Sequence, residues 1–163
     1  MFAVGDTVIY GSVGVCKISD ITENKLTGVV RKYYVLKQID SYESVIYVPV
    51  DNEKLTSRMR CVPTDKELKK ILKDAKKCEL SWIDDNLSRN DAFHSILNDG
   101  EITQVIKLFR VLHFKKSKLS DNGKHLHKAD EKIYKECAKL LSSELSSILK
   151  TDNSDILSLV VED

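Results

Sequence analysis

Proline and glycine are scarce in this chain of 163 residues, which has two prolines and six glycines. This low content of proline and glycine argues against long disordered stretches, and only the tail from about residue 151 is expected to be flexible. The cysteines are widely scattered and form no Cys-x-x-Cys pair, which argues against a zinc knuckle or a disulfide framework: Cys16, Cys61, Cys78 and Cys137. Reduced thiols of this kind are typical of a cytoplasmic protein.

Targeting signals are also lacking. The opening residues, Met-Phe-Ala-Val-Gly-Asp, contain no basic segment followed by an apolar one. No apolar run approaches the roughly 20 residues of a membrane span. We therefore expect a cytoplasmic protein with no membrane partner.

Catalytic signatures are absent as well. The sequence has no Gly-x-Ser-x-Gly or Walker motif, and no cysteine stands near a histidine. His125 and His127 are two residues apart at an expected helix start, where such side chains do not face one another. A solvated role on a basic helix is therefore favoured over a metal site. We expect no enzyme activity, no catalytic residue, no metal, no cofactor and no small-molecule substrate.

The sequence pattern changes from β-rich runs to helical spacing near Val62 and Pro63. Before this point, short β-rich runs are separated by breaks every 8–12 residues, the pattern of a small meander or barrel. The runs are Thr7–Tyr10, Val15–Asp20, Lys32–Lys37, Ser44–Pro49 and Met59–Val62. Pro49 lacks a backbone N–H, so it should end its strand or lie at an edge.

Helical spacing dominates after the boundary. Thr64-Asp65-Lys66-Glu67 fits a capping box. Further helices are expected from Trp82 with Ser81 as cap, over about 102–112, and from about Lys124 to Leu149, with a short turn over Asp155 to Val160. The sequence thus predicts an α+β chain, with a β domain over 1–62 and an all-α bundle over 63–163.

Positive charge gathers in the second part. Residues 105–140 carry ten Lys and Arg against four acids, whereas residues 1–56 carry six against seven. Lys115-Lys116-x-Lys118 is explained equally well by an ordinary helix C-terminus, where cations are favoured, or by phosphate contact. A stripe at helical spacing adds to the case for an anionic partner: Lys124, Lys128, Lys132, Lys135 and Lys139.

Trp82 is the single tryptophan. A tryptophan is most often part of a core. At a helix start beside basic helices it can instead stack on nucleic acid or wedge between bases. Both readings stay open from the residues alone.

The N-terminal part contains a series of short motifs in order: Phe2-x-Val4-Gly5-Asp6-x-Val8-x-Tyr10, Gly14-Val15, Tyr34-Val35-Leu36-Lys37 and Val48-Pro49. Together they resemble the CarD/CdnL family and the polymerase-interacting domain of the transcription-repair coupling factor. Asn98-Asp99-Gly100-Glu101 and Ala129-Asp130-Glu131 extend the likeness to about residue 150. The helicase motifs of the coupling factor are absent here.

The resemblance implies a Tudor-like β module that binds the β subunit of RNA polymerase. It also implies a helical module that touches promoter DNA, without sequence-specific readout, at the upstream edge of the transcription bubble and stabilises the open complex. A monomer without cofactors, located with RNA polymerase at the nucleoid, is expected. The rival interpretation is an adaptor whose helical part binds another protein.

Site residues follow from the same likeness. The positions that match the family's polymerase contacts are Asn24, Lys25, Tyr47, Val48 and Pro49. Many family members carry basic residues where Asn24 and Tyr47 stand here. On the DNA side, an ungapped alignment through Gly100 places Asn86 at the family's tryptophan station, four residues after Trp82. The DNA-contacting set implied by the likeness and the basic stretch is Trp82, Asn86, Arg89, Lys115, Lys116, Lys124 and Lys128.

Overall fold

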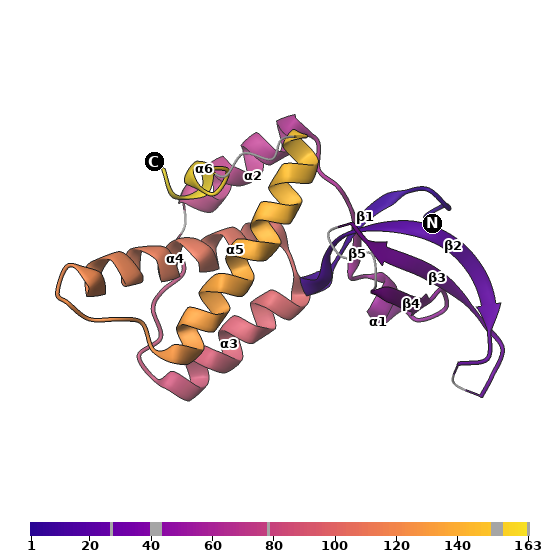
Figure 1. The fold of residues 1–163 in the computed structure, drawn as a ribbon, viewed down its shortest axis with the longest axis horizontal. Coiled ribbons are helices and arrows are strands. Elements are labelled where there is room, and N and C mark those ends of the chain that lie inside the picture. Colours follow the sequence, from indigo (N-terminus) through magenta and orange to yellow (C-terminus); the bar gives the residue numbers. More distant parts are fainter. Residues whose placement is uncertain (27, 40–43, 78, 151–154, 163) are drawn as a thin grey trace. The chain divides into compact units, whose positions relative to one another are not determined.

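The chain divides into two compact units, Met1–Val62 (unit 1) and Pro63–Asp163 (unit 2). A computed structural model describes residues 1–26, 28–39, 44–77, 79–150 and 155–162 (Figure 1). Cys78 and residues 151–154, where the flexible tail is expected to begin, lie outside the described residues. Each unit is considered by itself below.

Unit 1 is a five-stranded antiparallel sheet in the order β4-β3-β2-β1-β5. Its strands are β1 (Thr7–Tyr10), β2 (Gly14–Asn24), β3 (Arg31–Gln38), β4 (Val45–Pro49) and β5 (Met59–Cys61). A single 3-10 turn, η1 (Gly11–Val13), joins β1 to β2. The predicted β meander is confirmed, but the described strands form an open sheet and not a closed barrel, with β4 and β5 at its two edges.

The core of unit 1 follows the alternation of strand side chains. Every second residue of β3 points to the same face, so Tyr34 and Leu36 join Val48 from β4 and Ile18 from β2, each at most 4% exposed. A bulge between Ile18 and Asp20 changes the register of β2 against β3, and Ser19 Oγ donates to the Val35 carbonyl at 3.1 Å.

A short helix lies between β4 and β5, where no helix was predicted. This helix is α1 (Glu53–Thr56), and Asn52 caps it by accepting a hydrogen bond from the Leu55 N–H at 3.2 Å. An asparagine in extended conformation before the first turn satisfies a backbone donor that would otherwise be free. Leu55 packs against the core of unit 1, which holds the helix to the sheet.

Helices are the only regular secondary structure in the described part of unit 2. Its helices are α2 (Asp65–Lys77), α3 (Asn86–Asp99), α4 (Ile102–Ser120), α5 (Lys128–Leu149) and α6 (Ser158–Val161). The predicted capping box is confirmed, because Thr64 N–H donates to Glu67 Oε2 at 2.8 Å and Glu67 N–H donates to Thr64 Oγ1 at 3.4 Å. Gly100 ends α3 in the left-handed conformation, with φ of 65°.

Two helix starts differ from the prediction. Helix α3 begins at Asn86 and not at Trp82, because Asp85 is the cap and accepts from the Ser88 N–H at 2.8 Å. Helix α5 begins at Lys128 and not at Lys124, after His127 in extended conformation. The start of α3 was misplaced because the prediction used Ser81 as its cap. The start of α5 was misplaced because the helix was expected directly after the break at Gly123, whereas His127 is its cap.

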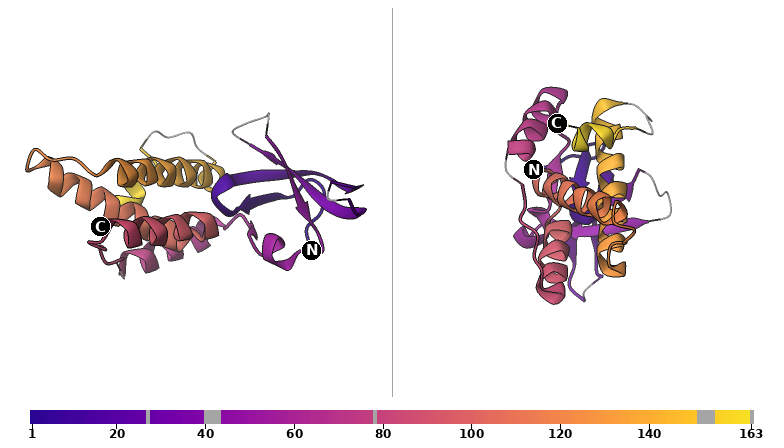
Figure 2. Two further views of the ribbon diagram at one scale, coloured as in Figure 1. Left: turned by 90° about the horizontal axis from the view of Figure 1, so that it is seen from below. Right: turned by 90° about the vertical axis from the view of Figure 1, so that its left-hand side faces the viewer.

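Helix α4 contacts α2, α3, α5 and α6 (Figure 2). Phe109 on α4 stacks on Tyr134 of α5, with ring centroids 5.0 Å apart. Arg110 donates to the Val160 carbonyl at 2.7 Å and so ties the end of the chain to α4. No described helix is long and apolar enough to cross a membrane.

Candidate functional site

The first candidate surface is the β4 edge of unit 1. Tyr47 is 42% exposed and meets the ring of Tyr33 edge to face, with centroids 6.3 Å apart. Pro49 is half-buried beside Tyr33. Val48 is fully buried in the core, so its side chain is not available to a partner. The Val-Pro motif therefore shapes the strand, and Tyr47 offers the exposed side chain.

The second group of predicted polymerase contacts lies at the tip of the β2–β3 hairpin. Asn24 ends β2 opposite Arg31, and its Oδ1 accepts from the Lys25 N–H at 2.7 Å. Arg31 is two residues along β3 from Tyr33, which pairs with Pro49, so the tip lies beyond the same end of β4, roughly 7 Å further along the strand direction. Asn24 and Lys25 are both exposed. The structure thus brings Asn24, Lys25 and Pro49 to one end of the sheet.

Trp82 lies in unit 2, in the loop that precedes α3. It is half-buried, and its ring meets Phe93 at a centroid distance of 6.2 Å and an angle of 68°. The guanidinium carbon of Arg89 lies 4.5 Å from the centre of the indole ring, and Lys115 Nζ lies 4.6 Å from it. Two cations on one indole hold it by cation–π attraction and leave only part of the ring accessible. Trp82 therefore packs on the core and also reaches the surface of unit 2.

Arg89 links the loop before α3 to helix α5. It is 4% exposed, and its Nε and Nη2 donate to the two carboxylate oxygens of Asp130 on α5 at 3.0 and 2.8 Å. Nη1 donates to the carbonyls of Ile83 and Asp84, and Nη2 also donates to Asn86 Oδ1 at 2.6 Å. All five guanidinium N–H groups are thus used within the chain.

The burial of Arg89 changes its assignment. A guanidinium without a free N–H does not favour the direct DNA contact that the family likeness implied, and it instead fixes the loop that carries Trp82. Asn86 is exposed, but its side-chain oxygen is engaged by Arg89. Asp130, which is 3% exposed, belongs to the Ala129-Asp130-Glu131 motif but was not predicted as a site residue, since its partner Arg89 is 41 residues away.

The remaining predicted DNA contacts form a separate group. Lys115 and Lys116 are consecutive on α4 and therefore point about 100° apart around the helix. Lys115 faces Trp82, whereas Lys116 pairs with Glu131 of α5 at 3.1 Å and lies 4.6 Å from the ring centre of Tyr134. Lys124 is in the loop before α5. Lys128 is the first residue of that helix.

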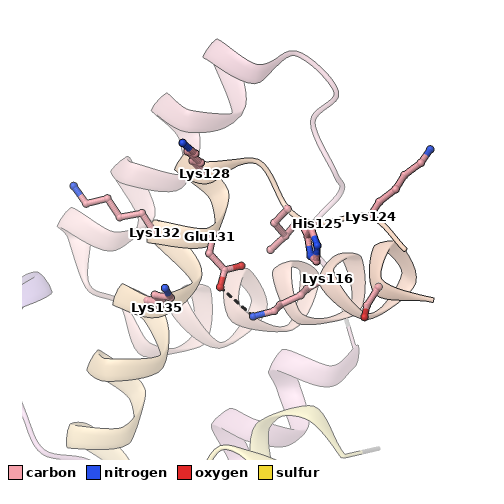
Figure 3. A pocket seen from close by; sticks show the side chains of 9 residues that line it. Lys116, Lys124, His125, Lys128, Glu131, Lys132 and Lys135 are labelled. Carbon is pink, nitrogen blue, oxygen red and sulfur yellow. Dashed lines mark hydrogen bonds and ion pairs between the residues drawn. The ribbon is translucent and has the colours of Figure 1, made fainter. Parts of the chain in front are cut away.

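Lys116, Lys124 and Lys128, but not Lys115, line a pocket of about 600 Å³ between the end of α4 and the start of α5 (Figure 3). Five lysines line it: Lys116, Lys124, Lys128, Lys132 and Lys135. A second pocket of about 290 Å³ adjoins it, and Lys124 lines both. Of the stripe expected on one helix, Lys124 lies in the loop before α5, whereas Lys128, Lys132, Lys135 and Lys139 lie on α5, and all but Lys139 line the pocket.

The histidines are placed differently from one another. His113 on α4 is half-buried, with Nδ1 3.2 Å from the Tyr134 hydroxyl. Burial, together with the charges of Lys116 and Arg110, lowers its pKa and so favours the neutral ring. His127 caps α5 by accepting from the Ala129 N–H at 3.3 Å. In the described ranges no group of three or more histidine, cysteine or acidic side chains could hold a metal ion.

Comparison with known families concerns unit 1. Residues 2–62 match the family described as the CarD-like/TRCF RID domain. This match covers nearly all of unit 1, which is called the RID domain below. The match ends at Val62, the last residue of unit 1. No curated protein matches the chain.

The motifs that carry the likeness mostly shape the RID domain. Phe2 packs edge to face on Tyr34, with centroids 6.2 Å apart. Gly5 has a φ of 97° and donates its N–H to the Ile18 carbonyl at 2.8 Å, while Asp6 accepts from the Ala3 N–H. A positive φ of this size favours glycine. The motif thus marks the fold of the domain.

Proposed function

We propose that the chain is a non-enzymatic transcription regulator that binds the β subunit of RNA polymerase through its RID domain and promoter DNA through unit 2. The matched family is an RNA polymerase-interacting domain, and this match is the observation that carries the proposal. In this function the protein stabilises the open complex at the upstream edge of the bubble. Such a role places it in the cytoplasm, on polymerase.

The β4 edge supports the polymerase contact. An edge strand presents backbone N–H and C=O groups that a strand of another protein can pair with, while exposed side chains provide specificity. Tyr47 supplies such a side chain, and the hairpin tip with Lys25 adds positive charge near the same end of the sheet. This arrangement fits the addition of a polymerase strand beside β4.

Substituting Tyr47 with aspartate is expected to weaken polymerase binding by at least tenfold, because an uncompensated charge at the centre of an interface costs more than the ~1.4 kcal/mol that a factor of ten represents. The full chain is immobilised and its affinity for core polymerase is measured. Leu159→Asp in unit 2 is the matched control, since Leu159 is 41% exposed and Tyr47 42%. Unchanged affinity of Tyr47→Asp would remove Tyr47 from the interface.

Three features support the DNA contact of unit 2. Part of the Trp82 ring is accessible, Lys115 lies against it, and the lysines at the α4–α5 turn concentrate positive charge on the same unit. Phosphate contacts of this kind carry little sequence information. Tethering by the RID domain raises the local concentration of unit 2 at the promoter to about the millimolar scale, so that weak DNA affinity suffices.

Neutralising Lys124 and Lys128 should flatten the salt dependence of DNA binding. Each lost phosphate contact lowers the slope of log affinity against log salt by about 0.9, so Lys124→Gln/Lys128→Gln is expected to lower it by up to about 1.8. Lys69→Gln/Lys70→Gln is the control, because both lysines are exposed on α2. DNA binding by wild type that does not depend on salt, or no binding at all, would favour an adaptor that binds another protein.

A further inference from the structure

The pocket at the α4–α5 turn has more positive charge than its surroundings neutralise. Its lining contains five lysines and one histidine but a single carboxylate, Glu131, which is paired with Lys116 at 3.1 Å. Lys132 Nζ lies 3.9 Å from Glu136 Oε1, which is long for an ion pair. Within the described parts of the chain, no ion pair joins Lys124, Lys128 or Lys135 to a carboxylate.

The shape of the pocket concentrates this charge. A volume of about 600 Å³ falls within the range of about 300–1,000 Å³ that is typical of small-molecule sites. A concave surface lined by one sign of charge focuses the potential more than a flat or convex one does. Duplex DNA, by contrast, presents its phosphates along a wide convex ridge, which suits an open face better than a recess.

The backbone around the pocket is also arranged for an anion. The first turn of α5, with the positive end of its dipole, begins at Lys128 beside the pocket. The negative end of α4 lies near as well, but its last carbonyls are already engaged: Ser120 accepts from the Gly123 N–H at 2.9 Å and Leu119 from the Lys124 N–H at 2.8 Å. Buried Leu126 contributes an apolar part of the lining.

We propose that this pocket binds a small polyanion with several adjacent phosphate groups, such as an inorganic or nucleoside triphosphate. Lys124, Lys128 and Lys135 provide the unpaired ammonium groups for the phosphates. Figure 3 shows Lys116 and Glu131 facing each other, while the flexible Lys124 and Lys132 extend away from this pair and have room to turn toward a ligand. Two adjacent phosphates match a lysine cluster better than a single phosphate, because their charges are close together.

The site overlaps the proposed DNA surface at Lys116, Lys124 and Lys128. A bound polyphosphate therefore competes with DNA for the same ammonium groups, and its concentration would set how strongly unit 2 holds the promoter. The binding itself does not depend on the proposed function, because Lys132 and Lys135 lie outside the proposed DNA set.

The test is a calorimetric titration of the full chain, without DNA or polymerase, at constant ionic strength. Inorganic triphosphate is the first probe, adenosine and guanosine triphosphates the second, and inorganic monophosphate the reference. Wild type is expected to bind triphosphate at least tenfold more tightly than monophosphate. Lys132→Gln/Lys135→Gln is expected to weaken triphosphate binding about tenfold, corresponding to the ~1.4 kcal/mol of one charge-assisted contact.

Lys70→Gln/Lys139→Gln is the matched control, since it removes two exposed lysines that do not line the pocket. It should bind triphosphate within about twofold of wild type, a change of under ~0.5 kcal/mol. Equal weakening in both double variants, or equal affinity of wild type for triphosphate and monophosphate, would overturn the proposal. Loss of DNA affinity in Lys132→Gln/Lys135→Gln with triphosphate binding unchanged would also overturn it and assign the pocket to DNA.

Discussion

Substituting Asp130 with alanine is expected to lower the free energy of unfolding by about 3–5 kcal/mol, the range found when one partner of a buried ion pair is removed. The guanidinium of Arg89 is 4% exposed and would lose both of its hydrogen bonds to the carboxylate. Its remaining acceptors are the Ile83 and Asp84 carbonyls and Asn86, none of which neutralises the charge. Urea denaturation, followed by circular dichroism, measures the loss.

The double variant Arg89→Met/Asp130→Leu distinguishes the loss of the whole ion pair from the loss of one partner. Removing both charges leaves neither member of this pair buried without its partner, so the double variant is expected to be more stable than Asp130→Ala by several kcal/mol. Asp85→Ala is the control for an acid that is close in space but exposed, and it should cost only the ~1 kcal/mol of a helix cap. If Asp130→Ala lowers the free energy of unfolding by less than about 1 kcal/mol, the Arg89 side chain must become solvated in the variant, and the loop before α3 is not rigid.

Substituting Trp82 with alanine is expected to shorten the lifetime of the open complex several-fold and to cost about 2–3 kcal/mol of stability. The cost should be less than the ~3–5 kcal/mol of a fully buried aromatic, because the ring is only half-buried. The loss comes from the contact with Phe93 and the two cation–π contacts. Promoter complexes challenged with competitor DNA measure the lifetime.

Stability loss alone must be separated from loss of the DNA contact. Ile148→Ala provides a matched destabilisation, because Ile148 is 6% exposed and lies near the C-terminal end of α5, about 30 Å along the helix from Lys128. Open complexes formed with Ile148→Ala should live as long as those with wild type at a temperature where both proteins are folded. Equal lifetimes for Trp82→Ala and Ile148→Ala would assign Trp82 to the core of unit 2 alone.

Local chemistry explains which parts of the fold were predictable. The capping box at Thr64 and the glycine stop at Gly100 are contained within four or five residues, so the sequence determines them. The starts of α3 and α5 depend on which of several nearby polar residues caps the helix. The prediction used Ser81 as the cap of α3 in place of Asp85, and His127 is not a usual cap, so both starts were predicted too early.

The strand pattern alone did not determine which of the predicted contact side chains are exposed. Tyr47 and Val48 are adjacent, so one had to face the core and the other the surface, but the sequence alone did not show which. Arg89 illustrates the opposite difficulty, since its partner Asp130 is 41 residues away and no local pattern joins them. The clustering of lysines around a pocket likewise depends on the α4–α5 turn, where the prediction had placed Lys124 on the long helix and not in the loop before it.

Photo-crosslinking from position 47 tests the central claim most directly. Tyr47 is replaced by the tyrosine-like crosslinker p-benzoylphenylalanine, the full chain is mixed with RNA polymerase and illuminated, and the crosslinked subunit is identified by mass spectrometry. The same crosslinker at Leu159, which is about equally exposed, is the control. We expect position 47 to crosslink to the β subunit and position 159 not to do so. Crosslinking of position 47 to a different subunit, or to none while the full chain remains bound to polymerase, would contradict the account.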